Sequence, residues 1–204
     1  SATEDAATMQ VLCVDKTGTL TLNQLVVEGL YPEEKVSSED LLLCAALSSN
    51  ISNRDSIDAA ILSFAKKQNL SFDSYKQMQY VPFSPQTRKT EAHIEGLEGS
   101  FKVMKGALKT IAQAASLNEI QTRRLEVTSD LLAKKGYRTL GIAKTVGEQT
   151  QFLGIVALYD PPRPDSAELI RRLHALGVSV KMLTGDAAPV AQQIASEVGL
   201  GKVI

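Results

Sequence analysis

A short apolar run that ends abruptly in a carboxylate constrains the fold of this chain more than any other stretch. Residues 10–14 predict a buried strand, and the heptad Asp15-Lys16-Thr17-Gly18-Thr19-Leu20-Thr21 follows directly. Small and hydroxylated residues after a strand can turn their backbone N–H groups toward an anion. Because open α/β sheets place ligands at the carboxyl ends of strands, we interpret Asp15 as a nucleophile or metal ligand. The alternative is an ordinary turn or helix-capping aspartate.

The C-terminal part of the chain alternates strand and helix, which is typical of a parallel sheet. Residues 178–183 predict an apolar strand that ends in Thr184-Gly185-Asp186. Predicted helices precede and follow this strand, at residues 165–175 and 187–198. We therefore expect the strand at 10–14 to pair with the strand at 178–183, with both polar ends at one edge. Asp186 could instead cap the helix that follows it.

The middle of the chain has a different pattern of elements. Residues 25–158 predict strands with interposed helices, which favours an antiparallel sheet with flanking helices over a doubly wound sheet. A stiff connector, Asp160-Pro161-Pro162-Arg163-Pro164, follows. We predict an α/β architecture in which an incomplete parallel-sheet domain, residues 1–24 and 159–204, is split by an inserted α+β domain, residues 25–158.

Two finer expectations concern buried side chains. Cys13 and Cys44 lack the spacing of metal ligands, so both are expected to be reduced and buried. The helix predicted at residues 118–135 is expected to bury its apolar positions. These are Ile120, Leu125, Val127, Leu131 and Leu132.

The bulk properties exclude two classes of partner for the chain as it stands. The formal net charge of −1 over 204 residues provides no basic field for nucleic acid. No apolar stretch approaches the ~20 residues that a membrane helix needs. We therefore expect a soluble portion without a membrane span, in the reducing environment of the cytoplasmic side.

The heptad that begins at Asp15 resembles the phosphorylation signature of the P-type ATPases, which belong to the haloacid-dehalogenase-like superfamily. The resemblance implies that Asp15 attacks the γ-phosphorus of ATP and forms an aspartyl phosphate, with Lys16 and Thr17 in the catalytic site. It also implies that Thr184-Gly185-Asp186 is a second phosphate-site motif. Mg²⁺ would bind the Asp15 carboxylate and a backbone carbonyl at Thr17. The implied fold is a Rossmann-like phosphorylation domain split by a nucleotide-binding domain.

Thr17 bears on the type of reaction. Phosphatases of the wider superfamily carry a second aspartate at this position, which protonates the leaving group and then activates water. A threonine cannot act as a general base near neutral pH, so a persistent phosphoenzyme is expected. A soluble phosphatase with a cap domain and a non-catalytic nucleotide-binding module are the alternative functions.

The inserted domain resembles the nucleotide-binding domain of these ATPases. Phe83, in Pro82-Phe83-Ser84, matches the aromatic residue that stacks on adenine, although it could be a core residue. Lys105, followed by Gly106, matches the lysine at the mouth of the nucleotide pocket; the alternative is an exposed lysine at a strand end. Asp58, with Asp55 nearby, matches the acidic position near the adenine amino group, whereas such a pair is otherwise usually solvated.

Further charged positions are implied by the same resemblance. Arg138 matches the arginine that reaches the phosphates, and Asp160 and Arg163 match the hinge between the two domains. Lys89 and the preceding Arg88 are weaker matches, because this turn departs in sequence and length from that of the calcium pumps.

Within the family the sequence is most similar to the proton-pumping plasma-membrane type. The residues that carry this similarity are 15–23, 53–60, 82–85 and 160–168. The implied parent is a multi-pass plasma-membrane pump with actuator and transmembrane domains, and this chain is its cytoplasmic portion. The Gly-Asp-Gly-x-Asn-Asp segment that completes the family's Mg²⁺ site does not occur in the sequence. We therefore expect an excised piece that binds ATP but phosphorylates itself poorly.

Overall fold

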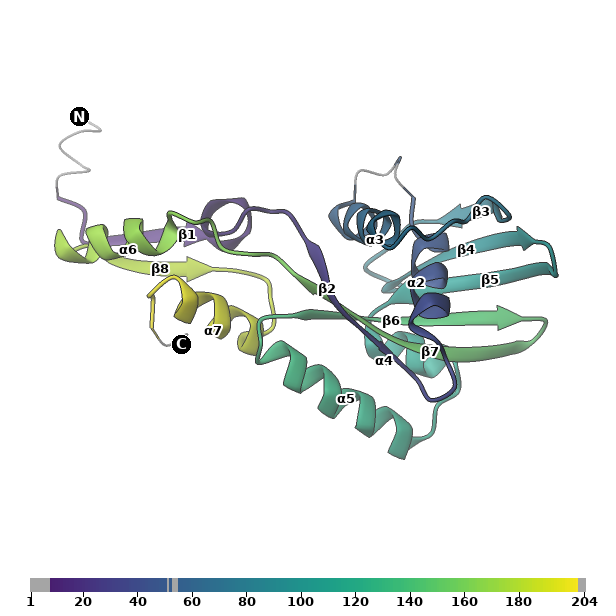
Figure 1. The fold of residues 1–204 in the computed structure, drawn as a ribbon. Coiled ribbons are helices and arrows are strands. Elements are labelled where there is room, and N and C mark those ends of the chain that lie inside the picture. Colours follow the sequence, from purple (N-terminus) through teal and green to yellow (C-terminus); the bar gives the residue numbers. More distant parts are fainter. Residues whose placement is uncertain (1–7, 51, 53–54, 202–204) are drawn as a thin grey trace. The chain divides into compact units, whose positions relative to one another are not determined.

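The computed structural model describes residues 8–50, 52 and 55–201, and it divides into two compact units (Figure 1). The first unit contains the described residues up to Gln24, Ala133–Gly136 and the described residues from Asp160 onward. The second unit contains Leu25–Leu132 and Tyr137–Tyr159. Apart from Ala133–Gly136, the chain leaves the first unit after Gln24, forms the second and returns at Asp160, and each unit has its own sheet and core.

A two-stranded parallel sheet lies at the centre of the first unit. Strand β1 (Val11–Asp15) pairs with β8 (Ser179–Leu183), and Asp15 lies opposite Leu183. The predicted parallel pairing is thus confirmed. Because the strands are parallel and in this register, the residues after both strands leave from the same edge of the sheet.

The core of the first unit lies on one face of this sheet. The side chains of Leu12 and Val14 turn toward that core and pack with Val180 of β8. The other elements of the unit are the wide turn η1 (Lys16–Leu20) and the helices α6 (Ser166–Ala175) and α7 (Ala188–Glu197). The buried core members are Leu20, Ile170, Val180 and Val198.

The opposite face of the β1–β8 sheet is exposed. Val11 and Leu183 are more than half exposed, and Cys13 is exposed as well. The prediction that Cys13 is buried is therefore wrong, because strand alternation places it on the face opposite the core. Cys44 is buried as expected, and burial raises the pKa of its thiol to about 12.

A six-stranded antiparallel sheet forms the second unit, in the order β2-β7-β6-β5-β4-β3. The predicted antiparallel sheet is confirmed. Successive strands from β3 to β7 pair with each other, while β2 pairs with β7 at the far edge. The strands are β2 (Val26–Pro32), β3 (Lys76–Val81), β4 (Lys89–Gly96), β5 (Gly99–Gly106), β6 (Arg138–Val146) and β7 (Gln149–Tyr159).

Helices cover both faces of this sheet. Helices α2 (Ser38–Leu47) and α3 (Ser56–Lys67) share one apolar core with it, and α4 (Leu108–Ala114) and α5 (Glu119–Ala133) share the other. Ser37 caps α2 by accepting a hydrogen bond from the Asp40 N–H at 2.9 Å. Helix α2 therefore begins directly after a serine of the type that caps helices in sequence-based prediction.

Helix α5 departs from its predicted apolar face. Leu125 and Leu132 are buried, but Ile120, Val127 and Leu131 are 82%, 50% and 57% exposed. Residues seven apart lie on one side of a helix, so Leu125 and Leu132 form the buried stripe. The other three apolar residues fall on a different side, and hydrophobicity alone did not distinguish the two sides.

Candidate functional site

The carboxylate of Asp15 is exposed at the carboxyl end of β1. Thr17 and Gly18 are also exposed, and Gly18 has a φ of 77°, which glycine adopts without strain. The Thr21 N–H donates to the Lys16 carbonyl oxygen at 3.0 Å and closes the turn η1. An open turn of small residues beside a carboxylate can admit a phosphoryl group close to the backbone.

Lys16 points away from the exposed turn. Its side chain is 2% exposed, and its Nζ lies 3.1 Å from Asp186 Oδ2 and 3.6 Å from Asp160 Oδ2. A buried ammonium between two carboxylates offsets their mutual repulsion and their loss of solvation. In this structure Lys16 therefore joins the end of β8 to the segment that follows the second unit, and it does not accompany Asp15 at the surface.

Asp160 forms hydrogen bonds that hold together the segment after η1 and the segment after β7. Its Oδ2 accepts a hydrogen bond from the Thr21 hydroxyl at 2.6 Å, and its Oδ1 accepts one from the Gln24 N–H at 3.1 Å. The Asp160 side chain is 6% exposed. Arg163 is 46% exposed and pairs with Asp165 at 3.5 Å. Asp160 is therefore placed to hold these two segments together, whereas the Arg163 side chain is accessible to solvent.

The second strand end is built around Asp186. The Asp186 N–H donates to Thr184 Oγ1 at 3.1 Å, and the Asp186 side chain is 3% exposed against Lys16. Helix α7 has Ala187 as its N-cap and no side-chain capping bond, so Asp186 does not cap this helix. Gly185 has open space where a Cβ atom would lie. The structure thus brings Asp186 and Lys16 together, next to the strand end that bears Asp15.

Four neighbouring strands of the second unit each contribute a side chain to one cavity of about 610 Å³. They are Tyr80 of β3, Thr90 of β4, Lys105 of β5 and Leu140 of β6. The start of α3 adds Asp55, Ile57 and Asp58, the segment after β3 adds Pro82 and Phe83, and β5 also contributes Gly106. The predicted binding residues Asp55, Asp58, Phe83, Lys105 and Gly106 therefore lie together.

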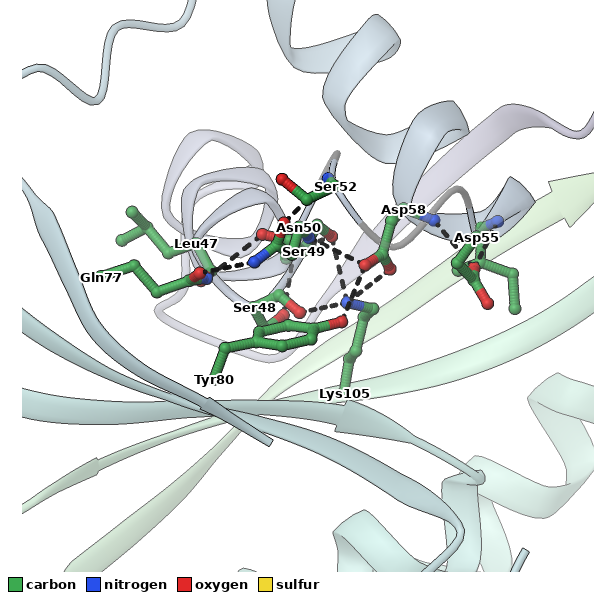
Figure 2. Close-up of polar contacts among 12 residues, drawn as sticks. Leu47, Ser48, Ser49, Asn50, Ser52, Asp55, Asp58, Gln77, Tyr80 and Lys105 are labelled. Atoms are coloured by element: carbon green, nitrogen blue, oxygen red, sulfur yellow. Dashed lines mark hydrogen bonds and ion pairs between the residues drawn. The ribbon is translucent and has the colours of Figure 1, made fainter. Parts of the chain in front are cut away.

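Figure 2 shows the Lys105 ammonium directed toward Asp58 and the end of α2. Nζ lies 2.9 Å from Asp58 Oδ1 and donates to the Ser48 carbonyl oxygen and, at 3.1 Å, to Ser49 Oγ. A lysine ammonium has three N–H donors, and these partners match that number. Lys105 is thus a buried anchor and not an exposed residue at a strand end.

Asp58 is the counterpart of this lysine. Its Oδ2 accepts hydrogen bonds from the Tyr80 hydroxyl at 2.9 Å and from the Asn50 N–H at 2.8 Å. The Asp58 side chain is 3% exposed, so it is not a solvated helix-face residue. Asp55 has a different role, because its Oδ1 accepts from the Ile57 N–H at 2.8 Å and from the Asp58 N–H at 3.2 Å as the N-cap of α3.

Burial and the ion pair act on Lys105 in opposite directions. Burial lowers the pKa of the Lys105 ammonium below its ordinary value, and the charge of Asp58 opposes this effect. The geometry therefore makes the charge of Lys105 dependent on Asp58. Loss of either member leaves the other buried without compensation.

Phe83 and Gly106 shape the opening of the cavity. The Phe83 side chain is 56% exposed, which excludes a place in the core. A Cβ atom on Gly106 would collide with the Arg88 carbonyl oxygen, so this position requires glycine. An exposed aromatic ring beside a partly apolar cavity can stack on a planar ligand.

A family model described as haloacid dehalogenase-like hydrolase matches residues 9–204, which is nearly the whole chain. The chain belongs to the haloacid dehalogenase-like hydrolases. The exposed Asp15 at the end of β1 lies within the matched residues. The match covers residues of both units, so the second unit is included in it.

Relatives of this haloacid dehalogenase-like chain include cation-transporting ATPases. A protein of Methanocaldococcus jannaschii named as a cation-transporting ATPase is 42% identical over 100% of the chain and 25% of its own length. The plasma membrane ATPases of Zygosaccharomyces rouxii and Saccharomyces cerevisiae are 39% and 38% identical over 98% of the chain and 23% of theirs. The chain therefore spans about a quarter of the length of these relatives.

The fold of the chain is also similar to that of a solved cation-transporting ATPase. The crystal structure of a zinc-transporting PIB-type ATPase aligns with 99% of this chain and 30% of its own, with a TM-score of 0.63 and 27% identity. The resemblance to P-type ATPases that the heptad at Asp15 indicates is thus confirmed. None of the helices in the described part of the chain has both the length and the apolar character to cross a bilayer.

Several positions predicted to bind nucleotide lie outside the lining of the cavity. Arg138 begins β6 and is exposed, and Lys89 pairs with Glu91 at 2.8 Å. Arg88 is exposed and has a φ of 52°. These cations border the second unit's sheet without lining its cavity, and their proposed contacts with phosphates stay predictions.

Sequence reasoning missed Tyr80, Thr90 and the residues at the end of α2. Tyr80 and Ser49 carry hydroxyl groups that bond to the buried ion pair. Only Thr90 could have been identified from the sequence, because it is a polar residue at the end of an alternating row whose other members, Ala92 and Ile94, are apolar. The others became visible only when the strands were placed side by side.

Proposed function

We propose that this chain is the nucleotide-binding and phosphoryl-accepting part of a P-type cation ATPase. The observation that carries the proposal is the cavity in which the buried Lys105–Asp58 pair lies beside the exposed ring of Phe83. The alignment of the whole chain with cation-transporting ATPases supports it. In this proposal residues 25–158 are the nucleotide-binding domain, and residues 1–24 and 159–204 belong to the phosphorylation domain.

ATP would bind with its base in the cavity of the second unit. Phe83 would stack on the purine, and Ile57 and Leu140 would contact its faces or edges as apolar walls. Lys105 and Asp58 keep the end of α2 and the start of α3 in place around this space. The triphosphate would then extend out of the cavity toward solvent.

Asp15 would accept the γ-phosphoryl group. One carboxylate oxygen of Asp15 attacks the γ-phosphorus, the bond from that phosphorus to the β–γ bridging oxygen breaks, and ADP leaves with the bridging oxygen. The exposure of Asp15 permits the approach of this group. The open turn at Gly18 leaves room for phosphoryl oxygens near the backbone.

Mg²⁺ fits this site only in part. No cluster of three or more His, Cys, Asp or Glu side chains suited to a metal occurs among the described residues. Asp160 and Asp186 both form ion pairs with Lys16. The Asp15 carboxylate and the Thr17 carbonyl oxygen are then the protein groups that would bind the metal. Because Mg²⁺ retains waters and binds phosphate oxygens, these two groups would hold it together with ATP. The bound ion would offset the charge of the phosphoryl oxygens.

Thr17 supports a transport ATPase over a phosphatase. A general base at this position would activate water against the aspartyl phosphate, and a threonine hydroxyl does not serve as one near neutral pH. The phosphoenzyme would therefore persist until another part of the protein hydrolyses it. Such an intermediate suits a pump, in which phosphorylation and hydrolysis accompany different conformations.

We propose the proton as the transported cation and the cytoplasmic side of a membrane as the location of this portion. The sequence of residues 160–168 and the likeness to the yeast plasma membrane ATPases support both statements. Actuator and transmembrane domains of the parent pump would be its partners. The zinc-transporting ATPase is similar in fold and shows that this architecture occurs with another cation.

Replacement of Phe83 tests the nucleotide site. Phe83→Ala is expected to weaken ATP binding by about tenfold or more, because stacking of a base on an aromatic ring contributes about 1–3 kcal/mol. Its thermal stability should change little, since the ring is 56% exposed. Isothermal titration of the 204-residue chain with ATP measures the affinity.

Leu97→Ala is the matched control for Phe83→Ala, because Leu97 is 90% exposed and lies in the turn between β4 and β5, outside the cavity. It should bind ATP like the unmodified chain. Equal affinities of the Phe83 and Leu97 variants, or the absence of saturable binding by the unmodified chain, would contradict the proposed site.

A further inference from the structure

Thr90 ends a row of inward-facing side chains on β4. Ile94, Ala92 and Thr90 alternate along the strand and are 1%, 0% and 4% exposed. Thr90 lies directly opposite Lys105 of β5 in the antiparallel register. Residues opposite each other in such a pair point to the same face, so Thr90 and Lys105 lie side by side at the cavity.

The hydroxyl of Thr90 differs from the other polar groups of this cavity. Asp55 caps α3, while Lys105 and Tyr80 each bond to the Asp58 carboxylate. In contrast, nothing in the part of the chain that the structure describes forms a hydrogen bond with the Thr90 side chain. The hydroxyl faces the cavity, where water can bond to it, and a ligand group placed there can take over that hydrogen bond.

The charge of the cavity indicates which part of a nucleotide meets this hydroxyl. Asp55 and Asp58 carry two negative charges and Lys105 one positive charge, so the lining is negative by one unit. Such a lining repels a triphosphate and accepts a neutral group. A purine base presents both hydrogen-bond donors and acceptors along its edge, and a threonine hydroxyl can donate and accept.

We propose that Thr90 Oγ1 forms a hydrogen bond with the edge of the bound nucleobase and is a specificity-determining residue of this site. The inference rests on the proposed binding of ATP in the cavity. The hydroxyl supplies a directional contact in the floor of the cavity, and Phe83 supplies the stacking surface at its rim. Thr90 thus helps to select bases whose edges match it.

Thr90→Val tests this contact because valine preserves the shape and removes the hydroxyl. The dissociation constants for ATP and for adenosine should both rise by about three- to tenfold. Thr90→Ser, which keeps the hydroxyl, should retain most of the affinity. The melting temperature of Thr90→Val should not fall, because the hydroxyl has no partner among the described residues of the ligand-free chain.

Thr145→Val is the matched control. Thr145 is also buried, but its hydroxyl bonds to Thr150 at 2.9 Å and it does not line the cavity. This variant should lose stability and keep its affinity for ATP. The comparison separates loss of a ligand contact from loss of a structural hydrogen bond.

The outcomes of these titrations distinguish the two proposals. If the unmodified chain binds ATP and Thr90→Val binds it equally well, the role of Thr90 is overturned while the nucleotide site stands. A loss of affinity for ATP but not for adenosine overturns the contact with the base. Absence of ATP binding by the unmodified chain overturns the proposed function and this inference together.

Discussion

Lys105→Met is expected to lower the free energy of unfolding of the second unit by about 3–5 kcal/mol, because it leaves a buried carboxylate without its cation. Asp58 would retain its bonds to Tyr80 and Asn50 but lose the ammonium at 2.9 Å. The end of α2 would also lose its bonds from Nζ. ATP binding should be lost with the geometry of the cavity.

Denaturant unfolding monitored by tyrosine fluorescence measures this loss of stability in the second unit. The chain has no tryptophan, and every tyrosine lies in the second unit: Tyr31, Tyr75, Tyr80, Tyr137 and Tyr159. Lys102→Met, in the same strand but 40% exposed, is the control and should cost at most about 1 kcal/mol.

A double replacement identifies the ion pair as the cause. Lys105→Met combined with Asp58→Asn removes both buried charges, so it should be less destabilising than the sum of the single changes. Additive effects of the two replacements, or a Lys105→Met variant as stable as the unmodified chain, would contradict the role assigned to the pair.

Asp15→Asn is expected to abolish phosphorylation by ATP in the full-length ATPase that we propose contains this chain. The amide keeps the size of the side chain but cannot form the acyl phosphate. Incubation with ATP labelled at the γ-phosphate, followed by acid precipitation, measures the covalent product. Hydroxylamine should release the label, since it cleaves acyl phosphates.

Asp165→Asn is the control for this experiment, because Asp165 is 61% exposed and pairs only with Arg163 among the ion pairs of the described residues. It should leave labelling unchanged. Persistent labelling of the Asp15 variant, or a phosphate that resists hydroxylamine, would contradict the role of Asp15.

Local patterns in the sequence predicted the elements and their pairing well. Two apolar runs, residues 10–14 and 178–183, each end in a polar segment, and this pattern predicted the parallel pairing of β1 with β8. In the structure Asp15 lies opposite Leu183. The serine and aspartate before α2 and α3 predicted where both helices begin. These signals are local, because strand alternation and helix capping depend on neighbouring residues.

The partners of the buried charged groups could not be predicted in the same way. Ser48 and Lys105 are 57 positions apart, and Thr21 and Asp160 are 139 apart, yet each pair forms a hydrogen bond. Lys16 lies next to the candidate nucleophile in sequence, but its side chain turns to the opposite side and is buried. Such pairings depend on how distant strands and connectors are brought together.

Exposed apolar side chains were the other source of error. Cys13 and Ile120 follow the composition of buried elements, but each lies on a side that the described structure leaves open. Periodicity identifies an amphipathic element, whereas the choice between two partly apolar sides is made by packing. A single sequence contains too little information for that choice.

Amide chemical-shift mapping of the labelled chain with ATP tests the central claim most directly, because it locates the nucleotide site without a substitution. Saturable shifts are predicted around Tyr80, Phe83, Thr90, Lys105 and Leu140, which line the cavity of the second unit. Absence of saturable shifts, or shifts confined to residues remote from this cavity, would contradict the account.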